Sequence, residues 1–181
     1  MNYYAGADLA RSFRTVRKNT IAVANDIPED QYGFRAAEGC MTVGEMLAHV
    51  AASPNWHIAA HRDEKKTFLG FEDFPRLIGV STAYAATLKT KADILVALEQ
   101  NGETLATWFD SLTDEILAEV VKFQEPIQPA TKTRFEMLMG IKEHEMHHRA
   151  QLMLIERMLG IVPPITRARQ AGAAARANAK P

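Results

Sequence analysis

The stretch Ile141–Leu152, IKEHEMHHRAQL, decides the fold because it places ionisable side chains inside a helical apolar pattern. Alternating steps of three and four residues connect seven positions on one side of a helix. This seam consists of Leu138, Ile141, Glu145, His148, Leu152, Ile155 and Leu159. Burying Glu145 and His148 in its middle costs several kcal/mol unless they gain hydrogen-bond partners or ligands. The seam therefore predicts a buried helix with a polar site at its centre.

Three histidines have the spacing of metal ligands in a helical bundle. His144 lies one turn before His148, and side chains four residues apart share a helical face. A facing helix would supply a third ligand, and His49 qualifies because it adjoins the apolar stripe of Met46 and Val50. Three neutral imidazoles with an open position suit zinc, nickel or another divalent transition metal. The alternative is a hydrogen-bonded histidine cluster in the core.

Other polar and aromatic residues are candidates for the surroundings of this site. His57 and His61 are also four residues apart, and we interpret them as residues of the site's rim, with His57 a secondary ligand candidate. His147 is expected at the rim or outside the ligand shell. Trp56 follows Pro54 and is a candidate wall of the pocket, with a core aromatic as the alternative.

Residues 144–148 also match H-E-x-x-H, the zincin pattern in which the glutamate is a general base. Glu145 is thus a candidate catalytic base or ligand-orienting group, and hydrogen bonding to a neighbouring helix is an equal alternative. A metallohydrolase is less favoured, because no glycine and histidine follow at metzincin spacing and Glu156 is the one nearby downstream carboxylate. The chain also has no strand-rich half to hold an extended peptide.

Four helical segments predict an all-α four-helix bundle. They cover residues 6–26, 43–61, 81–110 and 132–159, with a long connection over residues 62–79 between the second and third. Pro54 predicts a kink just after His49. Residues 117–131 are expected to hold a short hairpin. We assign residues 1–164 to the bundle and residues 165–181 to a basic, alanine-rich tail that is expected to be partly disordered.

Composition narrows the classes of function. The chain has 181 residues, 47% hydrophobic and 24% charged residues, and a net charge of -1, which gives no general electrostatic support for nucleic-acid binding. No apolar run approaches the ~20 residues needed to span a bilayer. The single cysteine, Cys40, cannot form an internal disulfide. These features predict one cytoplasmic domain that binds neither membranes nor nucleic acid.

Three stretches of this chain resemble one known family. MTVGEMLAHV (residues 41–50) is similar to the second-helix ligand segment of the DinB-like (damage-inducible) four-helix-bundle metalloproteins, a family related to bacterial thiol transferases. HEMHHRAQL (residues 144–152) resembles the ligand pair of the family's fourth helix, and YGFRAAE (residues 32–38) resembles its loop into the second helix. The resemblance covers residues 4–159.

The resemblance implies an up-down-down-up bundle, a homodimer and metal ligands at His49, His144 and His148. It also implies a metal-dependent transferase or isomerase that activates a low-molecular-weight thiol, such as bacillithiol or mycothiol, for attack on an electrophilic small molecule. Arg149 would then contact a carboxylate of the thiol. A non-catalytic bundle that binds a metal, a small molecule or a partner during stress is the alternative.

Overall fold

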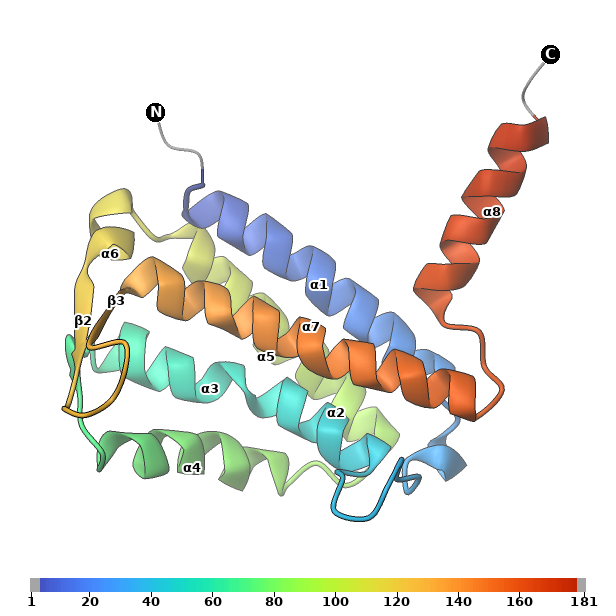
Figure 1. Ribbon diagram of the computed structural model, residues 1–181, viewed down its shortest axis with the longest axis horizontal. Helices are drawn as coiled ribbons and strands as arrows, with labels where there is room; N and C mark the ends of the chain where they lie inside the picture. Colours follow the sequence, from blue (N-terminus) through green and yellow to red (C-terminus); the bar gives the residue numbers. More distant parts are fainter. Residues whose placement is uncertain (1–3, 179–181) are drawn as a thin grey trace.

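Four long helices form a bundle in the computed structural model, which describes residues 4–178 (Figure 1). They are α1 (Gly6–Asp26), α2 (Val43–Ala52), α5 (Lys91–Asp110) and α7 (Arg134–Met158). Helix α1 lies beside α5 and α7, and α2 lies beside the same two helices on the other side. Helices α1 and α7 run in one direction and α2 and α5 in the other. The predicted all-α bundle with up-down-down-up topology is confirmed.

The second helix is interrupted, but not just after His49, where Pro54 had led us to expect a kink. A capping box starts α2, because Thr42 Oγ1 accepts the amide N–H of Glu45 while the Glu45 carboxylate accepts the amide N–H of Thr42. The helix continues past His49 to Ala52 and breaks at Ser53. Pro54 then occupies the first position of α3 (Pro54–His57), where its missing N–H loses no helical bond.

A π-helical turn, η2 (Ile58–Asp63), follows α3. Its wider hydrogen bonding is seen in the amide N–H of Glu64, which donates to the carbonyl of Ala59 five residues back at 2.9 Å. The turn buries His61 against Arg134 of α7, with 2.8 Å between His61 Nδ1 and Arg134 Nη1. The second helical segment therefore extends two residues beyond its predicted end.

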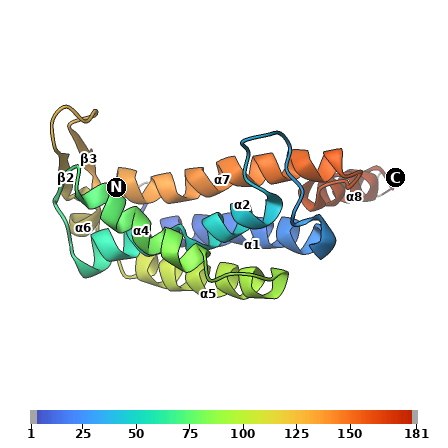
Figure 2. The same cartoon turned by 90° about the horizontal axis from the view of Figure 1, so that it is seen from below.

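The predicted long connection and third helix are partly wrong. The connection contains β1 (Phe68–Leu69) and much of α4 (Asp73–Ala85), and α4 and α5 are separate helices. Pro75 lies in the first turn of α4, where an absent N–H is tolerated. Thr90 caps α5 by accepting the amide N–H of Asp93, which marks a new helix start. Figure 2 shows α4 outside the four-helix bundle, on the side of α2.

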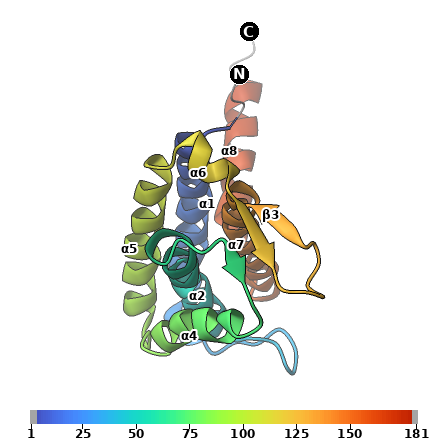
Figure 3. The same ribbon diagram turned by 90° about the vertical axis from the view of Figure 1, so that its left-hand side faces the viewer.

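A small sheet closes one end of the bundle (Figure 3). After α6 (Asp114–Ala118), strands β2 (Val120–Phe123) and β3 (Thr131–Thr133) form the expected hairpin. Strand β1 adds a parallel pairing to β2 that the sequence analysis did not predict, giving the order β1-β2-β3. Buried Leu69 and Val121 pack under this sheet with Leu77 of α4. The sheet thereby fixes one end of α4 beside the bundle.

The bundle interior has an apolar cluster toward each end. One includes Val23, Leu47, Leu98 and Leu152, and the other includes Phe13, Leu105, Phe109, Leu138 and Ile141. Between them lies a buried ion pair, in which Arg17 of α1 contacts Glu145 of α7 with nitrogen–oxygen distances of 2.9–3.0 Å. Gly102 of α5 passes this pair so closely that a Cβ there would lie 2.9 Å from Arg17 Cγ. A larger residue at that crossing would therefore push the Arg17 side chain out of place.

Residues 165–178 of the tail belong to a helix in the structure, whereas the sequence analysis expected a partly disordered tail and no helix. Helix α8 (Pro164–Asn178) has no buried residue and projects from the end of the bundle. Arg167 attaches its first turn to Asp26 of α1, at 2.7 and 2.9 Å. The alanine content that suggested a simple tail also gives high helix propensity. Residues 179–181 of the predicted tail lie outside the described residues.

None of the helices within residues 4–178 combines the length and apolar composition that crossing a bilayer requires.

A buried carboxyl group near α8 predicts a pH effect on stability. Both carboxyl oxygens of Glu156 are buried without a hydrogen-bond donor among residues 4–178. Burial, and then the charge of Asp26, raises the pKa of Glu156 to about 7 from its ordinary 4.5, whereas Arg157 and Arg167 act in the opposite direction. The folded chain thus holds a proton there that the unfolded chain releases. The free energy of unfolding is therefore expected to fall as the pH rises from 4.5 to 7.

Replacing Glu156 with glutamine should remove this loss. The quantity to compare is the free energy of unfolding of the variant minus that of the parent. We expect this difference to be roughly 2–3 kcal/mol larger at pH 8 than at pH 4.5. Urea denaturation at both pH values measures the difference, and exposed Glu143→Gln is the control. An equal difference at the two pH values would contradict the assignment.

Candidate metal centre

Three histidine side chains converge at the contact between α2 and α7. His49 comes from α2, and His144 and His148 come from successive turns of α7. The Nε2 atom of His144 lies 3.0 Å from His49 Nε2 and 3.1 Å from His148 Nε2. One nitrogen from each ring lies within 4.8 Å of the other two. The structure therefore brings together the three residues that helical spacing selected.

Two helices with defined starts hold these side chains in place. The Thr42–Glu45 capping box fixes the start of α2 six residues before His49. Thr133 caps α7 in the same way, accepting the amide N–H of Glu136 at 3.2 Å. The buried residues of the α7 seam then set the rotation of the helix, so that His144 and His148 face α2.

The hydrogen bonds around the rings leave nitrogen lone pairs in the centre. His148 Nδ1 lies 2.9 Å from Gln151 Oε1, which can only accept, so His148 carries its proton on Nδ1. His148 Nε2 then presents a lone pair to the site. Ser53 Oγ lies 3.4 Å from His144 Nδ1 and can accept its proton in the same way. Such outer contacts orient histidines that bind metals.

The distances also fit a single metal ion. Zinc binds imidazole nitrogen at about 2.0–2.1 Å, so two ligands at octahedral or tetrahedral angles are roughly 2.9–3.4 Å apart. The two nitrogen separations at His144 fall in this range. Three converging nitrogens cannot all be satisfied by hydrogen bonds to one another, because a neutral imidazole has one donor and one acceptor. A divalent cation would satisfy all three.

The environment keeps the three rings neutral. Burial, followed by the charges of His148 and His49, lowers the pKa of His144 to about 4. Burial, followed by His148, also lowers the pKa of His49. The pKa of His148 is lowered by burial, and Gln151 partly opposes this shift. Neutral imidazole is the form that binds metals, so the site is prepared for a cation at neutral pH.

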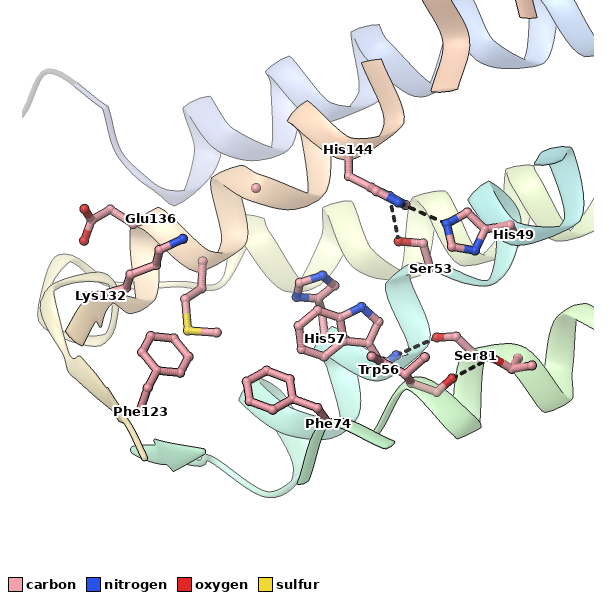
Figure 4. Close-up of a pocket in the computed structure, with 14 residues that line it drawn as sticks. His49, Ser53, Trp56, His57, Phe74, Ser81, Phe123, Lys132, Glu136 and His144 are labelled. Carbon is pink, nitrogen blue, oxygen red and sulfur yellow. Dashed lines mark hydrogen bonds between the residues drawn. The ribbon is translucent and has the colours of Figure 1, made fainter. Parts of the chain in front are cut away.

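A cavity of about 490 Å³ opens beside His49 and His144, two of the three histidines (Figure 4). His49, Ser53 and His144 line one end of it, and Phe74, Phe123 and Lys132 line the other. Helix α4 contributes Phe74, Ile78 and Ser81 to the wall. Ser81 Oγ accepts the amide N–H of Trp56 at 3.1 Å, which holds α4 against α3. A small molecule in this cavity would therefore lie next to two of the three candidate ligands.

The structure separates the other predicted site residues into two groups. Trp56 and His57 line the cavity. His147 is exposed, and its ring packs against His148 at a centroid distance of 5.2 Å. Arg149 does not line the cavity, because its Nη1 donates to the carbonyl of Val16 on α1 at 3.2 Å. The expected contact of Arg149 with a substrate carboxylate is therefore not supported by its position.

Glu145 takes the second of the two roles considered for it. Its carboxylate is buried and bound by Arg17, and it does not line the cavity. The side chain is thus engaged by α1, and a general base has to be accessible to the proton that it removes. The position of Glu145 therefore supports neither a catalytic role for its carboxylate nor the metallohydrolase interpretation of H-E-x-x-H.

Several residues of the site were not predicted. Gln151 lies three residues after His148, a spacing that puts both on one helical face and so could have been recognised. Ser53 lies one turn after His49, which is the same kind of signal. Phe74 and Ile78 come from α4, a helix that the sequence analysis placed in a connection. Phe123 comes from the hairpin, and no sequence pattern connected the hairpin to the histidines.

Comparison with known proteins gives a consistent family match. The sequence model of the DinB superfamily matches residues 12–152. No curated protein matches the chain significantly. Among solved structures, a DinB-like protein of Bacillus subtilis, YjoA, is 21% identical with a TM-score of 0.61, and the match covers 84% of this chain and 91% of that one.

Two further structures are similar at lower identity. YfiT from Bacillus subtilis, described as a probable metal-dependent hydrolase with an unusual four-helix bundle topology, is 18% identical with a TM-score of 0.63, over 86% of this chain and 88% of that one. A mycothiol-dependent maleylpyruvate isomerase is 16% identical with a TM-score of 0.57, over 80% of this chain and 59% of that one. At these identities the structural likeness establishes the fold alone.

Proposed function

Because this chain belongs to the DinB superfamily, we propose that it is a metal-dependent enzyme that transfers a low-molecular-weight thiol to an electrophilic small molecule, or uses the thiol to isomerise it. His49, His144 and His148 would hold a divalent metal, with zinc or nickel the leading candidates. The observation that carries this proposal is the convergence of three neutral imidazole nitrogens at metal-ligand spacing beside a cavity. The mycothiol-dependent isomerase among the similar structures supports the thiol as cosubstrate.

The metal would lower the pKa of a bound thiol, so that a thiolate nucleophile exists at neutral pH. The protein's own residues perform the remaining tasks. Gln151 and Ser53 orient the imidazole rings, and the apolar walls of the cavity exclude water from the electrophile. In transfer, the sulfur forms a bond to an electrophilic carbon while the bond from that carbon to the departing group breaks, and the thiol proton passes to solvent or to the departing group.

A non-catalytic metal- or ligand-binding bundle is the second candidate. Structural zinc sites are closed by four protein ligands, whereas catalytic sites keep a position open. Among residues 4–178, the cluster of candidate ligands contains three side chains, and two of them line the cavity. This access favours the enzyme.

The homodimer stays a prediction. An outward stripe on α7 supports it, because exposed Met146, Leu154 and Met158 follow one another at intervals of eight and four residues. Leu154 and Met158, four residues apart, share a helical face, and Met146 lies about 80° around the helix from Leu154. Size-exclusion chromatography with light scattering would measure the mass in solution, and a monomer at micromolar concentration would contradict the prediction.

Elemental analysis tests the metal site. The protein would be purified without a histidine tag or nickel resin, as the parent, as His148→Ala and as His147→Ala. We expect roughly one metal per chain in the parent and in His147→Ala, and little in His148→Ala, because three ligands bind far more tightly than two. His147 is the matched control, since it is the adjacent exposed histidine.

Absence of metal from all three folded proteins, including after incubation with zinc, would overturn the proposal. If metal is present, thiol-dependent consumption of electrophiles would be measured by loss of free thiol. Consumption that His148→Ala abolishes and His147→Ala retains is the expected result. A site that holds metal but consumes no electrophile with any thiol would favour the non-catalytic bundle.

A further inference from the structure

One buried histidine in the cavity wall has no hydrogen-bond partner. His57 is 7% exposed, and its Nδ1 is fully buried without a partner among the described residues. Most buried polar side-chain atoms in native proteins are hydrogen-bonded, so an exception calls for a specific explanation. His57 lines the cavity between the histidine end and the aromatic end, as Figure 4 shows. Nδ1 itself has almost no accessible surface, so a ligand in the cavity would meet the ring at its other nitrogen, Nε2, which is not among the fully buried atoms.

The neighbours of His57 hold its ring in place but give its Nδ1 no hydrogen bond. Its ring packs on Trp56 at a centroid distance of 3.5 Å and stacks on His61 at 6.0 Å. His61 is itself fixed by Arg134, and Arg134 donates to the carboxylate of Glu119 at 2.6 and 3.0 Å. This chain of contacts ends at the His57 ring. The ring is thus positioned in advance, as a recognition group must be.

The electrostatics of His57 restrict what it can bind. Burial, followed by the neighbouring His61 and His144, keeps the pKa of His57 well below its ordinary value, so the ring is neutral. A neutral imidazole offers one donor and one acceptor. It therefore pairs with a neutral hydroxyl or carbonyl group of a ligand, and provides no positive charge for an anion.

Apolar and aromatic side chains make up much of the remaining wall of the cavity, which also holds Lys132 and Glu136. Trp56, Phe74 and Phe123 line it, and the rings of Phe74 and Phe123 lie within 15° of parallel at a centroid distance of 6.4 Å. Aromatic side chains pack well against other rings through stacked or edge-to-face contacts. A volume of about 490 Å³ lies in the range of small-molecule sites. These walls favour a flat ligand of one or two rings.

We propose that the cavity binds an aromatic compound with a hydroxyl or carbonyl group, and that His57 selects this compound by a hydrogen bond to the oxygen. This inference rests on the proposed function, because it assigns a substrate class to the cavity beside the metal site. His57 is a specificity-determining residue in this scheme. The oxygen lies at His57, between the histidines and the phenylalanines, and the rings lie against Trp56, Phe74 and Phe123.

Binding of 2-naphthol and naphthalene tests the inference. The sequence contains two tryptophans, so Trp108→Phe leaves Trp56 in the cavity wall as the fluorescence reporter. In this background we expect 2-naphthol to bind about 5- to 10-fold more tightly than naphthalene, the value of one hydrogen bond. Adding His57→Phe should remove this preference while leaving naphthalene affinity within about twofold.

Two further variants separate recognition from a general effect on folding. His57→Gln keeps a donor and an acceptor, so it should retain part of the preference for 2-naphthol. Phe123→Ala should weaken both ligands to a similar extent, because it removes an aromatic wall and leaves His57 unchanged. Equal affinities for the two ligands in the Trp108→Phe parent, or equal losses in His57→Phe and His57→Gln, would overturn the inference.

The titrations would be made with chelator-treated protein and with zinc-loaded protein. A His57-dependent preference in a protein that retains no metal would support the cavity's specificity while the proposed metal enzyme fails. One metal bound per chain without a preference for 2-naphthol would support the metal site and overturn the proposed specificity of the cavity. The two proposals can therefore fail separately.

Discussion

Replacing Glu145 with alanine is expected to lower the free energy of unfolding by about 3–5 kcal/mol, because it leaves the Arg17 guanidinium buried without its counter-charge. Arg17 is 4% exposed and Glu145 is 2% exposed. The guanidinium joins all four bundle helices. From α1 it reaches Glu145 on α7, the carbonyl of Leu98 on α5 at 2.7 Å and the carbonyl of Val50 on α2 at 3.4 Å.

Urea denaturation of three proteins would measure this effect. The parent, Glu145→Ala and the double variant Arg17→Met/Glu145→Met differ in how much charge stays buried. Replacing a buried ion pair by apolar residues of similar volume is often nearly neutral, so the double variant should recover most of the loss. A loss below about 1 kcal/mol in Glu145→Ala would show that the pair is solvated in solution.

Saturating zinc is expected to raise the free energy of unfolding by about 4 kcal/mol when its concentration is a thousand times the dissociation constant. The effect arises because the three histidines converge only in the folded chain. We also expect the metal-free protein to stay folded, because neither the two apolar clusters nor the Arg17–Glu145 pair contains any of the three metal ligands.

Thermal unfolding with zinc and with a chelator would measure this stabilisation. His148→Ala should lose most of it, and His147→Ala should retain it. Unfolding of the chelated parent at 25 °C would contradict the expectation and identify a structural metal, in favour of the non-catalytic alternative.

Helical periodicity in the sequence was enough to predict which residues of the second and last bundle helices face the site. His144 and His148 are one turn apart, and His49 follows a capping box that fixes its helix, so their positions followed from helical periodicity. The same periodicity correctly placed Glu145 in the core. It could not show that Arg17, 128 positions earlier, would reach it. The sequence pattern therefore suggested a catalytic carboxylate where the structure has an ion pair.

Long-range packing determined what the sequence analysis missed. Strand β1 has two residues and gains its identity from pairing with Lys122 and Phe123, more than fifty positions away. Because Pro75 and Gly79 usually interrupt helices, α4 was not predicted, although the proline lies in the first turn of that helix, where it is tolerated. One wall of the cavity was consequently absent from the prediction, and the aromatic character of the site became visible only in three dimensions.

The π-helical turn η2 has a consequence for how related sequences should be aligned. A π turn contains one residue more than an α-helical turn over the same rise, so it corresponds to a one-residue insertion. Deleting one of the three residues of η2 that precede His61 would rotate His61 by about 100° around the helix and away from Arg134. A relative whose segment is one residue shorter before His61 should therefore lack the support behind His57, so the length of this turn marks whether a sequence can provide it.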